Sequence, residues 1–349
     1  MSARALRPPY PPMEARLVEE LPEGLEWAYE PKWDGFRCVA FREGRSIELQ
    51  SKSGQSLTRY FPEVAETLRL VDARRFVLDG EIVVPVNGRL SFDDLLQRIH
   101  PAASRVQKLA LEHPAQLVVF DLLMDAGGRV LVELPFRERR RRLEAFATHE
   151  LEGIAGLRLS PATTKIAIAR KWLAMTGGTF DGVVAKRVDL DYRSGDRTGM
   201  EKVKRQRTAD CVVGGFRYAA NAPAVGSLLL GLYDSQGLLH HVGFTSGFPA
   251  AERMSLLAQL RPLVKPPGFT GRAPGGHSRW STKRSGEWEP LEPRLVAEVR
   301  YDHFTGGRFR HGTRFLRWRP DKKPRLCTMD QVTGGQRRGS AEAKLARAR

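Results

Sequence analysis

Tyr29-Glu30-Pro31-Lys32-Trp33-Asp34-Gly35-Phe36-Arg37 is the stretch around which the rest of the sequence can be interpreted. Asp34-Gly35 permits a tight bend, and the apolar residues 38–41 that follow it favour a strand. Such a bend would let Lys32 and Arg37 point into one pocket. We predict that Lys32 acts there as a nucleophile.

The length and composition allow two domains. A chain of 349 residues with 41% hydrophobic residues can bury two separate cores. No apolar run approaches the length of a membrane span. The segment from Met1 to Met13 is rich in arginine and proline and has no apolar centre, so we do not expect a secretory signal.

The charge favours a polyanionic partner. The net charge is +17 at pH 7 and the pI is near 10.2, which indicates nucleic acid first and an anionic membrane second, against simple solubility. The three cysteines, at positions 38, 211 and 327, lack the spacing of a zinc site. We therefore expect no disulfide framework, no zinc, and a reduced cytoplasmic location associated with the nucleoid.

The N-terminal part of the sequence mixes predicted strands with predicted helices. Residues 1–20 suit an extended arm, because Pro8-Pro9-Tyr10-Pro11-Pro12 favours polyproline II. Ser91 can cap a helix that breaks at Pro101. The expected strands are 46–50, 76–85 (broken at Asp79-Gly80), 117–123 and 180–186, and the expected helices are 91–111, 137–149 and one from Ser160-Pro161 to Gly177-Gly178.

The pattern changes near Thr208, after which it is mostly β with one short helix at about 250–260. About five strands and one helix fit a small closed barrel of the OB type, with a four-way sandwich as the alternative. We therefore predict an α+β protein in four parts. These are an arm (1–20), a domain of antiparallel sheets with helices (21–207), an all-β OB-fold domain (208–326) and a basic, flexible tail (327–349).

Ionisable and aromatic side chains recur inside or beside the apolar runs. They are Lys32, Glu81, Phe120, Asp181, Lys202 and Lys204. One pocket built from them would hold an amine, two carboxylates, an aromatic plate and two further cations. That set suits a nucleoside triphosphate, with the base on the phenylalanine, the phosphates among Lys and Arg, and a divalent metal on the carboxylates.

The chemistry explains why the nucleophile would be a lysine. A free lysine amine has a pKa of about 10.4, so attack on phosphorus requires neighbouring cations and desolvation that favour its neutral form. Attack on an α-phosphate gives a phosphoramidate, and the cations stabilise the charge on the oxygens and on the leaving pyrophosphate. Arginine cannot replace lysine in this role, because it does not deprotonate.

Each of these residues taken alone also fits a structural role. Lys32 alone would be a solvated lysine, Phe120 a core residue, and Lys202 with Lys204 an exposed strand face. The arginines of 137–142 favour a solvated helix side over direct DNA contact. The functional interpretation depends on the whole set occurring in order.

In that order the segments resemble the motifs of the covalent nucleotidyltransferases, which include ATP-dependent DNA ligases, RNA ligases and mRNA-capping enzymes. A lone Lys-x-Asp-Gly is weak evidence, whereas six motifs in order, spread over about residues 15–325, are strong. The small two-domain bacterial ATP-dependent DNA ligases are the most similar type. The matching segments are 32–37 (motif I), 78–81 (III), 118–121 (IIIa), 180–186 (IV), 202–204 (V) and 315–322 (VI).

The resemblance implies that most of these residues bind ATP. Lys32 would become the AMP-lysine, beside a backbone at Glu30 that contacts the adenine edge. Asp181 would hold a divalent metal, Mg²⁺ or Mn²⁺, and Glu81 would bind that metal or the ribose. The other ATP-binding residues implied are Arg37 (ribose and nick phosphate), Lys52, Phe120 (stacked on adenine), Lys202 and Lys204 (α-phosphate), and Arg319 and Lys322 (pyrophosphate).

Three places depart from the family pattern. Lys52 stands where these ligases usually carry arginine, which keeps the charge but loses the bidentate fork. Asp181 stands where glutamate is common, and Met200-Glu201 replace a more usual aromatic-apolar pair. We expect altered kinetics rather than inactivity.

The sequence therefore predicts an ATP-dependent DNA ligase that seals nicks through an AMP-lysine and a DNA-adenylate. Its expected partner is nicked double-stranded DNA, with repair proteins as further candidates, no membrane, and a monomeric chain. The alternatives are an RNA ligase or capping enzyme, which share motif I, and a non-catalytic basic DNA-binding protein. Basic residues between Thr305 and Arg325, interleaved with Phe309, Phe315 and Trp318, would form the DNA-binding face. The DNA-binding residues expected there are Arg308, Arg310, Arg314 and Arg317.

Overall fold

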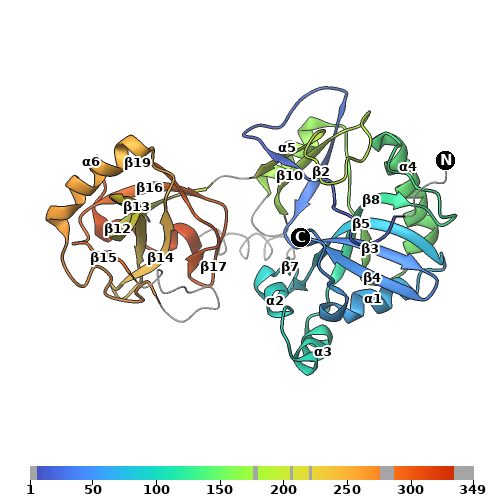
Figure 1. Cartoon of the computed structure of the whole chain (residues 1–349), viewed down its shortest axis with the longest axis horizontal. Coiled ribbons are helices and arrows are strands. Elements are labelled where there is room, and N and C mark those ends of the chain that lie inside the picture. Colours follow the sequence, from blue (N-terminus) through green and yellow to red (C-terminus); the bar gives the residue numbers. More distant parts are fainter. Residues whose placement is uncertain (1–5, 176–179, 205–206, 220–221, 276–286, 334–349) are drawn as a thin grey trace, which may run out of the picture. The chain divides into compact units, whose positions relative to one another are not determined.

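The computed structural model describes residues 6–175, 180–204, 207–219, 222–275 and 287–333. It consists of two compact units, Met1–Arg205 and Gln206–Arg349, each with its own hydrophobic core (Figure 1). The first unit combines two larger sheets and a short hairpin with helices, and the second is built mainly of strands. No helix in these ranges is long and apolar enough to cross a membrane.

The larger sheet of the first unit has the strand order β4-β3-β5-β8-β9, and Figure 1 shows β4, β3, β5 and β8 side by side. Its pairings are antiparallel except for β8 with β9. The expected break at Asp79-Gly80 is wrong, because β5 runs straight through it with only a shift of register against β8. The strands are β3 (Phe36–Glu43), β4 (Ser46–Ser51), β5 (Arg75–Val83), β8 (Gln116–Met124) and β9 (Leu157–Leu159).

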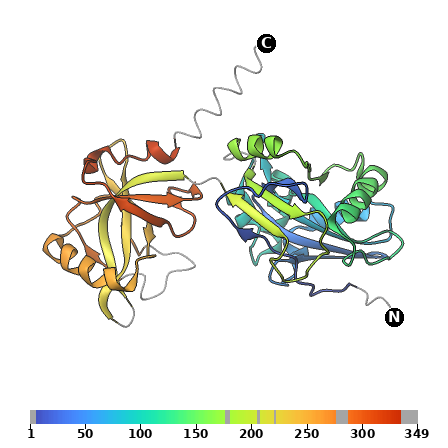
Figure 2. The same ribbon diagram turned by 90° about the horizontal axis from the view of Figure 1, so that it is seen from above.

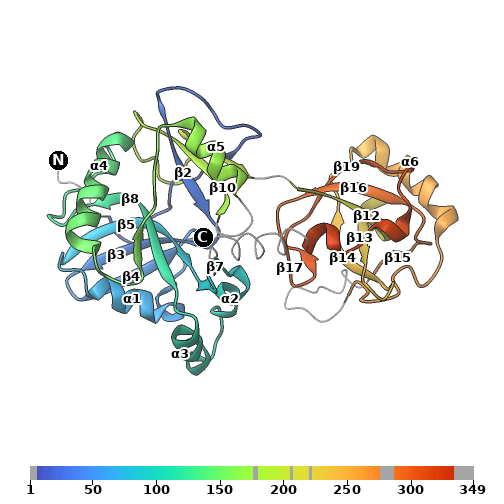
Figure 3. The ribbon, with the colours of Figure 1, turned by 180° about the vertical axis from the view of Figure 1, so that it is seen from behind.

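The two faces of this sheet have different partners, because successive side chains of a strand point to opposite faces. One face, with Cys38 and Leu78, packs against the helices α1 (Pro62–Arg69) and α4 (Phe136–Phe146) in the main core of the unit. Figure 3 shows α4 beside β8. The opposite face carries Val39 and Val77, which belong to a second cluster. The polar side chains of β3 and β5 that line the pocket point to this same face.

The smaller sheet has the order β1-β11-β10-β2. The helix α5 (Ile166–Ala174) packs against β10 and β2. The expected start of this helix at Ser160-Pro161 is wrong, since Ser160 is buried and its hydroxyl accepts a hydrogen bond from Trp33 Nε1 at 2.9 Å. The expected end at Gly177-Gly178 lies outside the described residues. The strands are β1 (Arg16–Leu17), β2 (Trp27–Trp33), β10 (Phe180–Arg187) and β11 (Met200–Lys204).

The segment between β5 and β8 follows the sequence prediction closely. Asn87 and Gly88, with φ of 49° and 75°, form the turn of the short hairpin β6 (Pro85–Val86) and β7 (Arg89–Leu90). The hydroxyl of Ser91 caps the next helix by accepting a hydrogen bond from the Asp94 amide at 3.2 Å. The helix is interrupted around Pro101 as expected, giving α2 (Phe92–Gln97) and α3 (Ala103–Glu112).

The second unit is a closed barrel of the OB type, as the sequence predicts. Its main sheet has the order β14-β13-β12-β16-β19, and a bridge between Thr245 and Thr313 joins the two ends. The helix α6 (Ala250–Leu260) comes between β14 and β16 and packs on β13 (Figure 2). The strands are β12 (Arg207–Ala219), β13 (Ala222–Tyr233), β14 (Leu239–Thr245), β15 (Glu289–Pro290), β16 (Val296–Tyr301), β17 (Phe304–Thr305), β18 (Arg308–Phe309) and β19 (Arg314–Trp318).

The chain beyond this barrel stays attached to it at first. Cys327 is fully buried, and its carbonyl accepts a hydrogen bond from the Tyr233 amide at 2.8 Å. Residues 334–349 of the expected tail lie outside the described residues.

Gly182 is the position in the smaller sheet where added bulk should do most harm. It lies opposite Lys32 on one neighbouring strand and Lys204 on the other, and a Cβ there would come within 2.0 Å of the Val203 carbonyl oxygen. Because that oxygen belongs to the backbone, the strands must move apart. We expect Gly182→Ala to lower the free energy of unfolding by roughly 1–3 kcal/mol in urea titrations.

Gly247→Ala is the matched control. Its Cβ would meet no atom within 4 Å, and its φ is not in the left-handed region. Equal effects of the two substitutions would contradict the steric argument.

Candidate active site

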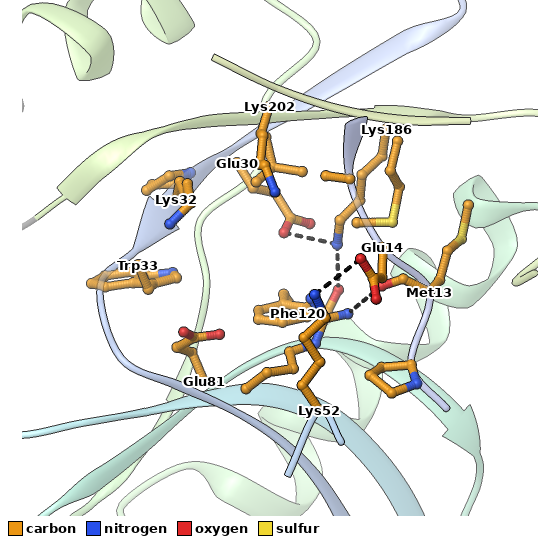
Figure 4. A pocket seen from close by; sticks show the side chains of 16 residues that line it. Met13, Glu14, Glu30, Lys32, Trp33, Lys52, Glu81, Phe120, Lys186 and Lys202 are labelled. Carbon is orange, nitrogen blue, oxygen red and sulfur yellow. Dashed lines mark hydrogen bonds and ion pairs between the residues drawn. The ribbon is translucent and has the colours of Figure 1, made fainter. Parts of the chain in front are cut away.

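One pocket in the first unit gathers most of the residues singled out in the sequence. It has a volume of about 170 Å³ and lies between the two sheets, with the segment 12–15 forming one wall. Figure 4 shows the labelled side chains around it. The pocket is lined by Pro12, Met13, Glu14, Ala15, Glu30, Pro31, Lys32, Trp33, Arg37, Lys52, Glu81, Phe120, Val184, Lys186, Met200 and Lys202.

Lys32 is held at the pocket by a carboxylate from the neighbouring strand. Its Nζ lies 2.5 Å from Asp181 Oδ2, and Lys204 Nζ lies 3.2 Å from the same oxygen. Asp181 sits at an irregularity in the pairing of β10 with β2, between Phe180 and Gly182. Such bulges redirect a side chain, and here the redirected side chain is a carboxylate that joins two lysines from two strands.

Lys202, the other lysine of β11, lines the pocket and is half-buried. Burial lowers its pKa, and Lys32, Lys204 and Lys52 lower it further. Positive charge is therefore concentrated on this side of the pocket, where an anion would be stabilised.

Arg37 lines the pocket but is already engaged by an acid. Asp79 accepts two hydrogen bonds of 2.6 Å from its guanidinium, and the buried Asp79 also accepts one of 2.6 Å from the Tyr192 hydroxyl. The guanidinium carbon lies 4.6 Å from the centre of the Phe120 ring. Asp79 raises the pKa of Arg37, although burial opposes this, so Arg37 is a fixed charge.

Glu81 lines the pocket and faces Arg37 across the β3–β5 pair. Burial raises the pKa of its carboxyl to about 7, although Lys32 and Arg37 act in the opposite direction. A further cation bound beside this buried carboxyl group would stabilise its charged form.

The inner end of the pocket contains an ion pair that was not predicted from the sequence. Glu30 is 2% exposed, and its carboxylate lies 2.9 Å from Lys186 Nζ. Lys186 also donates to the Phe120 carbonyl at 3.2 Å and lies 4.7 Å from the centre of its ring (Figure 4). Burial raises the pKa of Glu30, while Lys186 and Arg140 lower it. Lys186 ends an expected strand in the sequence, but nothing local identifies Glu30 as its partner.

The segment 12–15 brings a further acid to the mouth of the pocket. Glu14 pairs with Lys52 at 3.0 Å and with Arg197 at 3.2 Å. Lys52, the residue found where arginine is usual, is about half exposed and can turn toward a ligand.

The arginines of α4 form the solvated helix side that the sequence favours only in part, because Arg137 and Arg141 are exposed and others turn inward. Arg139 is buried and forms a two-pronged pair with Asp121, at 2.9 and 3.0 Å. Arg140 donates to the Ser160 carbonyl at 2.9 Å. Both arginines fix the back of the site, which a helical pattern of charges does not reveal.

The expected motif VI cations belong to the second unit and are paired there. Arg319 lies 2.9 Å from Asp210 and 2.8 Å from Asp321, and Lys322 Nζ lies 3.5 Å from Asp210. Asp210 is itself held by two hydrogen bonds between its backbone and the side chain of Gln331.

The expected DNA-binding arginines have different surroundings. Arg314 is exposed, Arg308 and Arg310 are half-buried, and Arg317 pairs with Glu298 at 2.7 Å. The aromatic residues interleaved with them do not form an exposed face. Phe309 is buried, and Phe315 and Trp318 pack against the core of the barrel.

The comparisons with known proteins all match DNA ligases. Two family models match: "ATP dependent DNA ligase domain" over residues 12–204, and "ATP dependent DNA ligase C terminal region" over residues 221–322. The chain is similar to DNA ligase C2 of Mycolicibacterium smegmatis, at 44% identity over 93% of this chain and 94% of that protein. DNA ligase C of Mycobacterium tuberculosis is 42% identical over the same shares of the two chains.

A solved structure from a study of Lig E DNA ligases has a similar fold. It aligns with a TM-score of 0.51 at 15% identity and covers 88% of this chain and 100% of that chain. At this identity the likeness concerns the fold alone.

The raised pKa of Glu81 should make stability depend on pH. Its carboxyl binds its proton up to about pH 7 in the folded state but only to about pH 4.5 when unfolded, so rising pH between these values destabilises the fold. Glu81→Gln removes this dependence. Without nucleotide or divalent metal, we expect the variant to gain on the order of 3 kcal/mol over the parent between pH 5 and pH 8.

Urea titrations across this pH range provide the measurement. Glu66→Gln, which neutralises an acid that is 71% exposed, serves as the control and should follow the parent. Parallel pH curves for the parent and Glu81→Gln would show that the carboxyl is not perturbed.

Proposed function

Because the chain belongs to the ATP-dependent DNA ligases, we propose that Lys32 is the amine that takes AMP from ATP and passes it to DNA. The observation that carries this assignment is the position of Lys32 at the pocket. Its Nζ is paired with Asp181, Lys204 is paired with the same carboxylate, and Lys202 lines the same pocket. The family matches support DNA as the substrate, against the RNA ligase and capping alternatives and against a protein without catalysis.

The proposed reaction has three steps. Lys32 Nζ attacks the α-phosphorus of ATP, a P–N bond forms, and the bond to pyrophosphate breaks. The AMP then passes to the 5′-phosphate at a nick, which frees the lysine. In the last step the 3′-hydroxyl attacks that 5′-phosphate, and AMP leaves as the strand is joined.

The first step requires Lys32 to give up its proton before it attacks. Asp181 Oδ2 lies 2.5 Å from Lys32 Nζ and would accept this proton. The same contact holds the amine at the pocket. Lys202 and Lys204 then stabilise charge on the α-phosphate oxygens as the P–N bond forms. Both roles follow from side chains that the smaller sheet fixes by its register.

The adenosine would occupy the inner part of the pocket. Phe120 offers a ring for stacking, and the buried Glu30 carboxylate can accept hydrogen bonds from an amino group. Arg37, fixed by Asp79, would contact the ribose and the nick phosphate, and Lys52 can reach the outer phosphates. The triphosphate then points toward Lys32.

A divalent metal suits the acids of this site. Glu81 and Asp181 offer carboxylate oxygens, the donors that Mg²⁺ and Mn²⁺ prefer, and a bound cation would stabilise the charged form of Glu81, whose pKa is raised by burial. We assign the metal to these two residues. When bound, it would neutralise charge on the α-phosphate and on the leaving pyrophosphate.

The second unit would supply Arg319 and Lys322 to orient pyrophosphate in the first step. Asp210 touches both cations and is anchored through Gln331, so it is the residue that positions them. The basic residues Arg308, Arg310, Arg314 and Arg317 would bind DNA in the later steps.

Lys32→Ala should abolish AMP-lysine formation with labelled ATP and lower nick sealing by more than about a thousandfold, because no other group replaces the nucleophile. Lys32→Arg should fail equally, since arginine does not deprotonate. Both variants should still seal a nick that is already adenylated. Labelled adduct on the Lys32→Ala protein would disprove the assignment.

Asp210→Asn should affect one step only. Loss of its charge removes an acid that both Arg319 and Lys322 contact, so the rate of AMP-lysine formation should fall about tenfold or more, while sealing of a pre-adenylated nick stays near the parent rate. Asp210→Glu, which keeps the charge, should recover much of the first step. Equal losses in both reactions would indicate a structural role instead.

A further inference from the structure

A cluster of positive charge in the second unit surrounds a buried histidine. His241, on β14, is 8% exposed, and no described residue meets hydrogen-bond geometry with either ring nitrogen. The Phe269 ring lies against it edge-on, with 5.5 Å between the ring centres. This aromatic contact does not explain why a polar ring occupies the position.

The charges around His241 come from three separate segments. Arg308 of β18, Arg217 of β12 and Arg272 are the charged groups that act on it. Burial first, and then these arginines, lower the pKa of His241 to about 3, partly offset by the backbone of Gly243. The histidine is therefore neutral at pH 7, and the charge of the cluster is carried by arginine.

The backbone holds this arrangement in place. The Arg272 carbonyl accepts a hydrogen bond from the His241 amide at 2.8 Å, and the Arg272 guanidinium donates to the carbonyl of Gly307. Gly306 and Gly307, with φ of 56° and 72°, make the two-residue turn between β17 and β18. This turn brings Arg308 next to the segment of Arg272, so the arginines are positioned before any ligand arrives.

Two of the three arginines, Arg272 and Arg308, have no acid partner in the part of the chain that the structure describes. The Nε of Arg308 is also buried, and no described residue offers it a hydrogen-bond partner. Arg317 and Arg319 of the same unit show the contrast, since both are paired with acids. Gathering guanidinium groups without an acid costs free energy, which a bound anion would offset.

The geometry points to a binding site for a phosphodiester of the DNA backbone, formed by Arg272 and Arg308 with Arg217 beside them. This inference rests on the proposed ligase function and specifies one point at which the second unit would hold DNA. The planar, forked guanidinium suits phosphate oxygens, and phosphate contacts fix the position of a duplex without selecting its sequence. A ligase must join nicks in any sequence, so such a contact suits its task.

The test compares Arg272→Ala/Arg308→Ala with the parent. Each protein is first adenylated with ATP, and its affinity for a nicked duplex is measured at several salt concentrations. We expect the double variant to bind about tenfold or more weakly, with a slope of log affinity against log salt that is shallower by about two. AMP-lysine formation from ATP alone should match the parent, which also verifies the fold of the first unit.

Arg294→Ala is the control for charge. Arg294 is 67% exposed and already paired with Glu292, so its loss should leave the affinity and the salt slope nearly unchanged. Arg308→Lys keeps the charge but loses the forked guanidinium. It should bind nicked DNA more weakly than the parent and more tightly than the double alanine variant. It also serves as the test if the double variant melts early.

Several results would overturn the site. One is a double variant that binds nicked DNA like Arg294→Ala, with the same salt slope. Another is a loss confined to AMP-lysine formation, which would mean that the arginines hold phosphates of ATP or pyrophosphate rather than DNA. A parent protein that forms no AMP-lysine would instead refute the proposed function, and the two failures are therefore distinguishable.

Discussion

The shared carboxylate of Asp181 is the interaction on which the rest of the site depends. It binds the ammonium groups of Lys32 and Lys204, which come from the two strands that flank its own. Taking either lysine away would remove part of the positive charge that compensates this buried carboxylate, which costs more than breaking a pair at the surface. The close packing at Gly182 then fixes the register, so the spacing of the charged groups is set by the backbone of the sheet.

Local features of the site could be predicted from the sequence, and long-range partners could not. Lys32, Glu81 and Phe120 each lie in or beside an apolar run that indicates a strand, and the structure brings all three to one pocket. The pairing of Glu30 with Lys186 joins strands that are far apart in the sequence, so no pattern indicates it. For the same reason the helix expected at Ser160 starts later, because a tertiary hydrogen bond to Trp33 uses the hydroxyl that would have capped it.

The arginines show what the amino-acid composition can and cannot predict about ligand binding. The net charge indicates a polyanionic partner, but several arginines act inside the protein. Arg42 is buried and donates to the carbonyls of Leu68 and Val71 at the end of α1, and Arg139 is buried against Asp121. A charge count cannot separate such residues from those that meet a ligand. Only the burial of each guanidinium and the groups that surround it do so, and those depend on the tertiary fold.

The wall formed by residues 12–15 has a consequence for how the protein can be modified. The segment precedes every motif, yet it closes the pocket and supplies Glu14 to Lys52. The Met13 carbonyl also accepts a hydrogen bond from Arg37 at 3.1 Å. A shortened chain that starts at β2 would keep every residue with a chemical role and lose part of the cavity that orients the nucleotide. An affinity tag is therefore safer at the other end of the chain, since none of the described residues beyond 202 lines this pocket.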